Sequence, residues 1–389
     1  MTAFTTLIRR CAPVALVAAG LGLSLPLHAD MFGNGGNGGN GGGKGKAKGN
    51  GNSYVVHNLV SDQSGVADQQ DTDLVNGWGV AFNPNGPAWV ADNGSGHSTF
   101  YDGMGNKVGS ITIPTVNGAG SGVPTGIAFN SSADFSTPAN GAARFLFATE
   151  DGGIFAWAPG LAAAVQMFPP SGAATTAVYK GIAIAGNGTA HQLYAADFHN
   201  KKIDVFSATF APVVKAGAFV DPGIPSSFGP FNIMNINGDL YVAYAMKDPN
   251  SEDELAGKGL GFVDVFTADG VLIRRVASHG NLNAPWGMAL APSAFGRFSN
   301  ALLVGNFGDG TINAFDLKNG TPLGQLRTST NQTLVIDGLW GIAFGNGVMD
   351  QSTEVLFFAA GPSDESHGLY GFIMPAPGSS SGGDDNGDQ

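Results

Sequence analysis

The stretch KGIAIAGNGTAHQLYAADFHNKKIDVF, residues 180–206, contains the unit from which most of this chain is built. It begins with the apolar phrase Gly181-Ile182-Ala183, continues through a second apolar run at 193–196 and ends at Phe206. In its last part, 202–206, apolar and polar residues alternate, as they do in a β-strand with one buried face. Gly and Asn separate the segments, which is typical of turns. The stretch therefore predicts three short antiparallel strands.

The same unit recurs six times along the chain. A phrase of Gly, an apolar residue and usually Ala begins at positions 79, 126, 181, 232, 287 and 341, in steps of 47, 55, 51, 55 and 54 residues. In the fourth copy, Asn232 replaces the glycine. A weaker fourth segment follows most copies, for example at 108–113. Repeats of about this length form stacked or radial arrays, and four short strands per repeat predict an all-β, six-bladed β-propeller. A seven-bladed ring is the structural alternative.

The two ends of this repeat region predict how the ring closes. The sixth copy offers only three strand segments before Pro375, Pro377 and a Ser/Gly run, whereas the strand-like run YVVHNLV (54–60) precedes the first copy. If this run supplies the outer strand of the sixth blade, no blade face is left open to water. We therefore expect a propeller over 54–374 whose last blade is closed by the N-terminal strand.

The remaining segments predict export and tethers. Arg9 and Arg10 precede an apolar stretch that ends near a small residue, so 1–29 is expected to be a Sec signal peptide. Residues 30–53 form a Gly/Asn-rich linker and 375–389 an acidic Gly/Ser tail, both expected to be disordered. The protein is then secreted or periplasmic, with no transmembrane segment in the mature chain. Cys11 is the only cysteine, so the core rather than disulfides must stabilise the fold.

Composition excludes one class of partner. The formal net charge is −12, which argues against nucleic acid as a partner. We also expect the protein to be a monomer.

In a propeller, the loops that enter the inner strands and those between second and third strands share one face, where a ring of aromatic and acidic side chains could bind a sugar, a peptide or a cation. The candidate residues of this face are Trp78, Asp92, Glu150, Asp197, His199, Phe231, Asn232, Trp286, Asn306 and Trp340.

Structural interpretations of these residues remain open. Trp78, Trp286 and Trp340 occupy equivalent repeat positions, which blade-to-blade packing also produces. Acidic residues that follow a strand often cap turns by accepting backbone N–H groups. Asn232 is the polar departure from the glycine column, and a ligand could meet it near the axis.

Several phrases carry a family resemblance. LYAADFHNKKIDVF (193–206) resembles the NHL repeat, and NLVSD (58–62), LVNGWGVAF (74–82), GNLNAPWGMALAP (280–292) and LWGIAF (339–344) resemble an uncharacterised family of exported bacterial six-bladed propeller proteins, some of which carry a PEP-CTERM sorting tail. The C-terminal SSSGGDDNGDQ departs from that family because it contains no sorting tail. The resemblance implies the fold and export, and it implies no activity.

The sequence is compatible with three functions. The leading one is a secreted binding module that uses one face of the ring to bind an unknown protein, peptide or glycan. The enzyme alternative resembles metal-dependent lactonase propellers, which would assign Glu150, Asp197 and Asn232 to a divalent cation such as Ca²⁺ in the channel. That family's opening acidic motif is replaced by NGWG (76–79), and no nucleophile elbow, P-loop or HExxH occurs. The third is a structural protein associated with an extracellular matrix.

Overall fold

The structure is a computed structural model that describes residues 53–118 and 120–377. These residues belong to one compact unit, Lys48–Gln389; the other unit, Met1–Ala47, lies outside the described residues. The predicted signal peptide (1–29) and most of the predicted linker and tail also lie outside them. Within the described ranges, no helix is long and apolar enough to cross a membrane.

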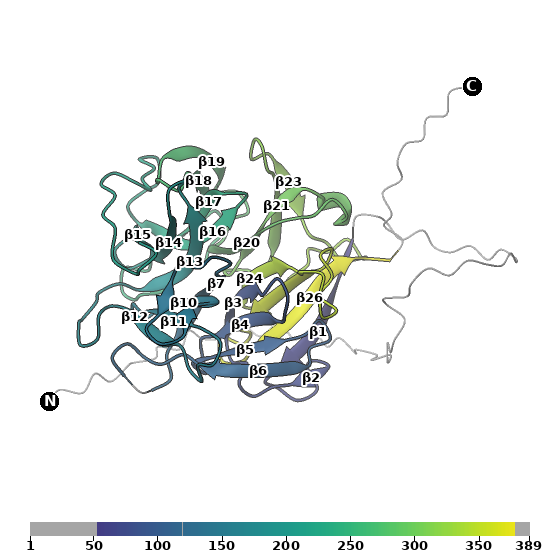
Figure 1. The fold of residues 1–389 in the computed structure, drawn as a ribbon. Helices are drawn as coiled ribbons and strands as arrows, with labels where there is room; N and C mark the ends of the chain where they lie inside the picture. Colours follow the sequence, from purple (N-terminus) through teal and green to yellow (C-terminus); the bar gives the residue numbers. More distant parts are fainter. Residues whose placement is uncertain (1–52, 119, 378–389) are drawn as a thin grey trace, which may run out of the picture. The chain divides into compact units, whose positions relative to one another are not determined.

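Six largely antiparallel sheets form the blades (Figure 1), and in the first five the chain runs from the innermost strand outwards. The first three blades are β3 (Gly77–Phe82), β4 (Ala88–Asp92), β5 (His97–Tyr101) and β6 (Lys107–Thr112); β7 (Pro124–Phe129), β10 (Phe145–Thr149), β11 (Ile154–Trp157) and β12 (Val165–Phe168); and β13 (Tyr179–Gly186), β14 (His191–Asp197) and β15 (Lys202–Phe206). The fourth and fifth are β16 (Phe228–Ile236), β17 (Asp239–Met246), β18 (Gly261–Phe266) and β19 (Leu272–Ser278); and β20 (Pro285–Leu290), β21 (Ala301–Asn306), β22 (Ile312–Asp316) and β23 (Pro322–Gln325).

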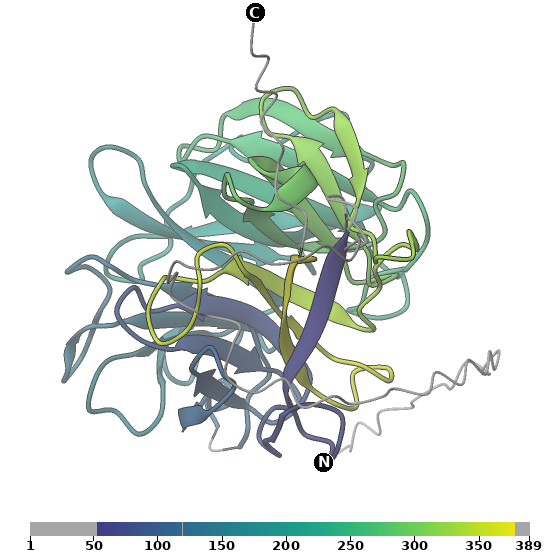
Figure 2. The ribbon, with the colours of Figure 1, turned by 90° about the vertical axis from the view of Figure 1, so that its right-hand side faces the viewer.

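The sixth blade joins the two ends of the propeller. It contains β24 (Leu339–Phe344), β25 (Leu356–Ala360), β26 (Leu369–Pro375) and β1 (Tyr54–Ser61), with the short β2 (Gln69–Gln70) at its edge. Strand β1 is antiparallel to β26, from Tyr54 opposite Pro375 to Ser61 opposite Leu369. Figure 2 shows this pairing as the purple first strand beside the yellow last one. The predicted six-bladed, all-β propeller and its closure by 54–60 are confirmed.

Two smaller elements and one irregular blade complete the fold. Strands β8 (Ser136–Thr137) and β9 (Gly141–Ala142) pair as a hairpin, and a 3-10 helix covers Gly296–Phe298. The third blade has three strands in place of four. Where a fourth would lie, only a short contact forms, in which the Val213 N–H donates to the Val205 carbonyl at 2.7 Å.

The glycine of the repeated phrase lets neighbouring inner strands approach closely. A Cβ atom on Gly79 would lie 2.7 Å from the Thr125 carbonyl oxygen, and one on Gly341 would lie 2.4 Å from the Trp78 oxygen. Both distances are shorter than real contacts allow. Asn232 occupies the same position in the fourth blade, and its Nδ2 donates to the equivalent carbonyl of the next blade, that of Trp286, at 2.8 Å. The asparagine amide therefore replaces a close backbone approach with a hydrogen bond.

Candidate functional site

An aromatic cluster fills one end of the propeller channel. Trp78, Phe231, Trp286 and Trp340 immediately precede the phrase in four different blades, and all four are buried in one cluster with Phe198. The rings of Trp78 and Trp340 stack with centroids 3.5 Å apart, and Trp286 meets both edge-on at 6.0 and 5.7 Å. Non-neighbouring blades thus touch across the axis. Such pairs stabilise a core by about 0.5–1.5 kcal/mol beyond burial, so these residues pack the ring together.

A buried lysine lies within this aromatic end. Lys180 precedes the phrase in the third blade and is only 1% exposed. Its Nζ lies 2.5 Å from Glu150 Oε1, 3.8 Å from Asp253 Oδ1 and 5.1 Å from the centroid of the Trp78 ring. The Lys180 carbonyl accepts a hydrogen bond from Trp286 Nε1 at 2.9 Å. Because taking a charge out of water is costly, an ammonium at this depth requires an explanation beyond packing.

Carboxylates from three blades surround the lysine. Glu150 follows β10, Asp253 and Glu254 lie in the long loop between β17 and β18, and Glu365 lies between β25 and β26. Two amides connect them: Asn93 Nδ2 donates to Glu150 Oε2 at 2.8 Å, and Asn76 Nδ2 donates to Glu365 Oε1 at 3.0 Å. We call this group, listed here in full, the axial cluster: Asn76, Asn93, Glu150, Lys180, Asp253, Glu254 and Glu365.

The charges of the axial cluster act on one another. Burial alone would lower the pKa of Lys180, but the charges of Glu150 and Glu254 outweigh it and raise that pKa above its usual value. Burial raises the pKa of Glu254 to about 7 against the opposing charge of Lys180. Burial also raises the pKa of Glu365, and the Glu150 charge adds to this shift. Perturbed carboxylates grouped around one cation are typical of functional sites.

The loop that carries Glu365 is strained. Ser363, Asp364 and Glu365 have φ values of 60°, 53° and 62°, so three successive non-glycine residues adopt the left-handed conformation. Each such residue costs about 1–2 kcal/mol. The Ser363 N–H donates to Asp337 Oδ2 at 2.9 Å, which helps to hold the turn. Strain of this kind persists where the surrounding structure imposes it, and it is concentrated at functional sites.

Other residues predicted from the sequence hold turns. Asp92, Asp197 and Asn306 end the second strands of alternate blades and are buried. Asp92 Oδ2 accepts the Thr99 N–H at 2.8 Å, and Asp197 Oδ1 accepts the Asn200 N–H at 3.1 Å. Burial raises the pKa of both Asp92 and Asp197.

Asn306 and His199 also have protein partners. Asn306 Oδ1 accepts the Asn283 N–H at 3.1 Å. His199 is exposed, with Nδ1 2.9 Å from a Glu252 carboxylate oxygen.

The three residues assigned to a metal by resemblance have different neighbours. Glu150 pairs with Lys180, Asp197 holds its turn, and Asn232 bonds to Trp286. Across residues 53–118 and 120–377, no group of three or more His, Cys, Asp or Glu side chains is arranged to hold a metal ion. The cation site therefore stays a prediction.

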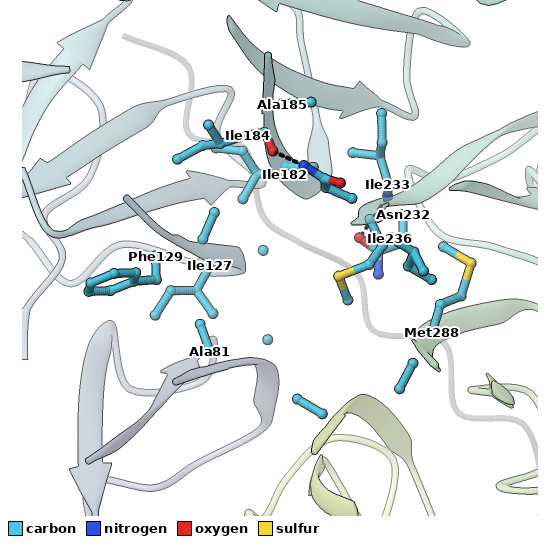
Figure 3. A pocket seen from close by; sticks show the side chains of 18 of the residues that line it. Ala81, Ile127, Phe129, Ile182, Ile184, Ala185, Asn232, Ile233, Ile236 and Met288 are labelled. Carbon is cyan, nitrogen blue, oxygen red and sulfur yellow. Dashed lines mark hydrogen bonds between the residues drawn. The ribbon is translucent and has the colours of Figure 1, made fainter. Parts of the chain in front are cut away.

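The other end of the channel is a cavity of about 770 Å³ (Figure 3). All six inner strands line it, through the apolar and alanine residues of the phrase itself, and Asn232 and Trp286 border it too. Neither this cavity nor Asn76, Asp253, Glu254 and Glu365 of the axial cluster were predicted from the sequence. Asp364 marks the neighbourhood of Glu365, and SEDE (251–254) marks that of Glu254, but neither segment follows the repeat period.

Six antiparallel blades around a channel, with a charged cluster at one end, define a six-bladed β-propeller protein. Among solved structures, the chain is similar to a protein of unknown function from Bacteroides thetaiotaomicron (TM-score 0.52, 11% identity, covering 83% of this chain and 76% of that one). It is also similar to a glucose dehydrogenase (TM-score 0.50, 13% identity, covering 82% and 99%). At these identities the likeness shows the fold alone. No family model matches the chain.

The chain belongs to the family of two uncharacterized proteins of Acanthamoeba polyphaga mimivirus, R648 and L690. It is 37% identical to R648 over 334 residues, which cover 82% of this chain and 80% of R648. It is 36% identical to L690 over 336 residues, which cover 83% and 86%. These relatives are viral, so they do not support the bacterial origin that the sequence resemblance implies.

Proposed function

We propose that the protein is a binding protein whose ligand presents a cationic ammonium or guanidinium group to the axial cluster. The observation that carries this proposal is that four acidic side chains are grouped around one buried ammonium, so this face has more acidic than cationic groups at its centre. A cation placed among them would offset that excess.

The pairing within the cluster supports a cationic ligand. Lys180 makes its short contact with Glu150, and Asp253 is 3.8 Å away. Glu254 and Glu365 form no ion pair within 4 Å in the part of the chain that the structure describes. Their raised pKa values mean that ionisation is disfavoured while no further cation is present. A bound cation would favour the ionised carboxylates, so binding and proton release are linked.

The solvent exposure of the axial cluster and the apolar residues beneath it also favour a binding site here. The side chain of Asp253 is 71% exposed, whereas that of Lys180 is 2% exposed, so the cluster reaches from solvent to the aromatic floor. That floor excludes water beneath the charges, and electrostatic attraction is stronger where the effective dielectric constant is lower.

A calorimetric titration and a peptide array test this function. Agmatine and spermidine are titrated calorimetrically into the protein. The array compares binding of peptides that carry Lys or Arg at their central position with binding of peptides that carry Gln there. The Glu365→Gln variant should weaken binding of whichever of these cations binds the wild-type protein at least about tenfold. Asp364→Asn is the matched control, because it removes the same charge from the adjacent exposed residue. Equal binding of peptides with central Lys, Arg and Gln, or equal losses of affinity in the two variants, would rule out the axial cluster as the site.

We also propose that the protein acts after export, as a secreted or periplasmic binding module. This rests on the signal-peptide pattern of 1–29. Mass spectrometry of the chain recovered from an exporting host should find an N-terminus near residue 30, and an intact Met1 on exported protein would contradict it.

A further inference from the structure

We propose that the cavity at the opposite end of the channel is a second binding site, which takes a neutral molecule with an apolar body and a hydrogen-bond donor. Its volume of about 770 Å³ lies within the range of small-molecule sites. It is separate from the axial cluster, so this proposal does not depend on the cationic ligand.

The wall of the cavity excludes charge. Among the residues that the structure describes, its lining includes no Asp, Glu, Lys or Arg, and the only ionisable side chain is His191, which is at the rim. Figure 3 shows Ile127, Ile182, Ile233 and Met288 around the space. A charged ligand would lose its hydration here without gaining a counter-charge, whereas an apolar body gains about 25 cal/mol per Å² buried.

The closed end of the cavity carries one polar anchor. Trp286 lines the cavity and also belongs to the aromatic cluster, so the cavity ends where that packing begins. Asn232 lies at the same depth, where its Nδ2 donates to the Trp286 carbonyl. Its Oδ1 accepts the Ile233 N–H at 2.8 Å, and an amide oxygen has two lone pairs. Oδ1 can therefore accept one further hydrogen bond, from a ligand hydroxyl or N–H group.

The open end is polar and formed by turns. Its lining includes Ser131, Asn235 and Asn237, all exposed, at the ends of inner strands opposite to the axial cluster. His191 lies here with Nδ1 2.7 Å from Asp134. Met234 and Met288 in the wall are flexible side chains that can adapt to an irregular ligand. The arrangement suits a molecule that enters with its apolar body first.

Two fluorescent probes test this site. N-phenyl-1-naphthylamine is neutral and apolar and has one N–H donor, and its 8-sulfonate differs by a charge. The wild-type protein should bind one neutral probe per chain, at least about tenfold more tightly than the sulfonate. Ala81→Leu, which fills part of the cavity, should weaken the neutral probe at least about tenfold. Ala142→Leu, a partly exposed position outside the cavity, is the control.

Each outcome decides the proposal. If Ala81→Leu does not fold, Ser131→Trp at the exposed mouth provides the same test of entry. Glu365→Gln should leave the neutral probe unaffected, which separates failure of this site from failure of the cationic one. Equal affinity for the two probes, absence of one-to-one binding, or unchanged affinity in a folded Ala81→Leu or Ser131→Trp protein would overturn it.

Discussion

At one end of the propeller channel, aromatic rings pack across the axis around a buried ammonium; at the other, the same six inner strands surround an apolar cavity of about 770 Å³. The cavity wall comes from the repeated phrase, whose residues vary little between blades. The aromatic end comes from the position before each phrase, which includes Lys180 and Thr125 as well as four aromatic residues. The residues of the repeated phrase therefore form the scaffold and its cavity. The position before each phrase varies between blades, and this position and the loops near it provide the charged side chains.

The largest expected effect is a loss of stability when the ion pair at the charged end is broken. Glu150→Gln leaves the buried Lys180 ammonium without its closest partner, and the free energy of unfolding should fall by about 3 kcal/mol. Chemical denaturation measures the change. Removing both charges in Glu150→Gln/Lys180→Met should recover most of the loss, because a desolvated pair contributes little net stability. If the double variant is as unstable as the single one, the pair is structural rather than retained for binding.

The next effect concerns the scaffold shared by both ends. Gly341→Ala would place a Cβ 2.4 Å from the Trp78 carbonyl, so we expect a loss of about 2 kcal/mol from forced separation of two inner strands. Gly186→Ala is the control, since its nearest neighbours lie 3.6 Å or more away. Thermal and denaturant unfolding compare the two. Similar losses would contradict the close-approach role of the glycine column.

A smaller effect is expected at the boundary between the two ends. Asn232→Ala removes the hydrogen bond to Trp286 and leaves a buried carbonyl without that donor, at a cost of about 1.5 kcal/mol. It should also weaken the neutral probe several-fold, by about the loss of one hydrogen bond. Unfolding curves and probe titrations check both. A variant with native stability and native probe affinity would contradict both roles assigned to Asn232.

The smallest effect is the pH dependence of the charged end. The pKa of Glu254 is about 7 in the folded protein and 4.5 ordinarily, so the folded state binds more protons between these values. Its contribution to stability is full below about pH 4.5 and is lost as the pH rises to about 7. Glu254→Gln should therefore match the wild type near pH 4 and exceed it by about 1 kcal/mol near pH 8, after allowance for solvent screening. Denaturation at the two pH values measures this; a variant less stable at pH 8 would reverse the assigned sign.

The fold could be predicted from the sequence because its signals are local and periodic. Strand alternation such as that of 202–206, turn residues and the phrase at 79, 126, 181, 232, 287 and 341 repeat in every blade, and 54–60 was the segment left to close the ring. The outer strand missing from the third blade was not evident, because absence of pairing depends on how 207–227 packs.

The axial cluster could be predicted only in part. Glu150 was named, but the burial of Lys180 beside it depends on carboxylates from other blades. Glu254 and Glu365 lie in loops that do not recur from blade to blade. The strained turn at 363–365 contains no glycine that would indicate a left-handed backbone. The cavity escaped prediction because an apolar residue in an inner strand looks the same in sequence whether it faces a core or a channel.

Simultaneous titration tests most directly whether the two ends are separate sites. The affinity of N-phenyl-1-naphthylamine is measured with and without a saturating concentration of the cationic probe that responds at the axial cluster. Because buried Trp78, Trp286 and Trp340 lie between the two regions, we expect both probes to bind together and the neutral probe's affinity to change less than about twofold. Mutual exclusion of the probes would contradict it, since that result requires one shared site.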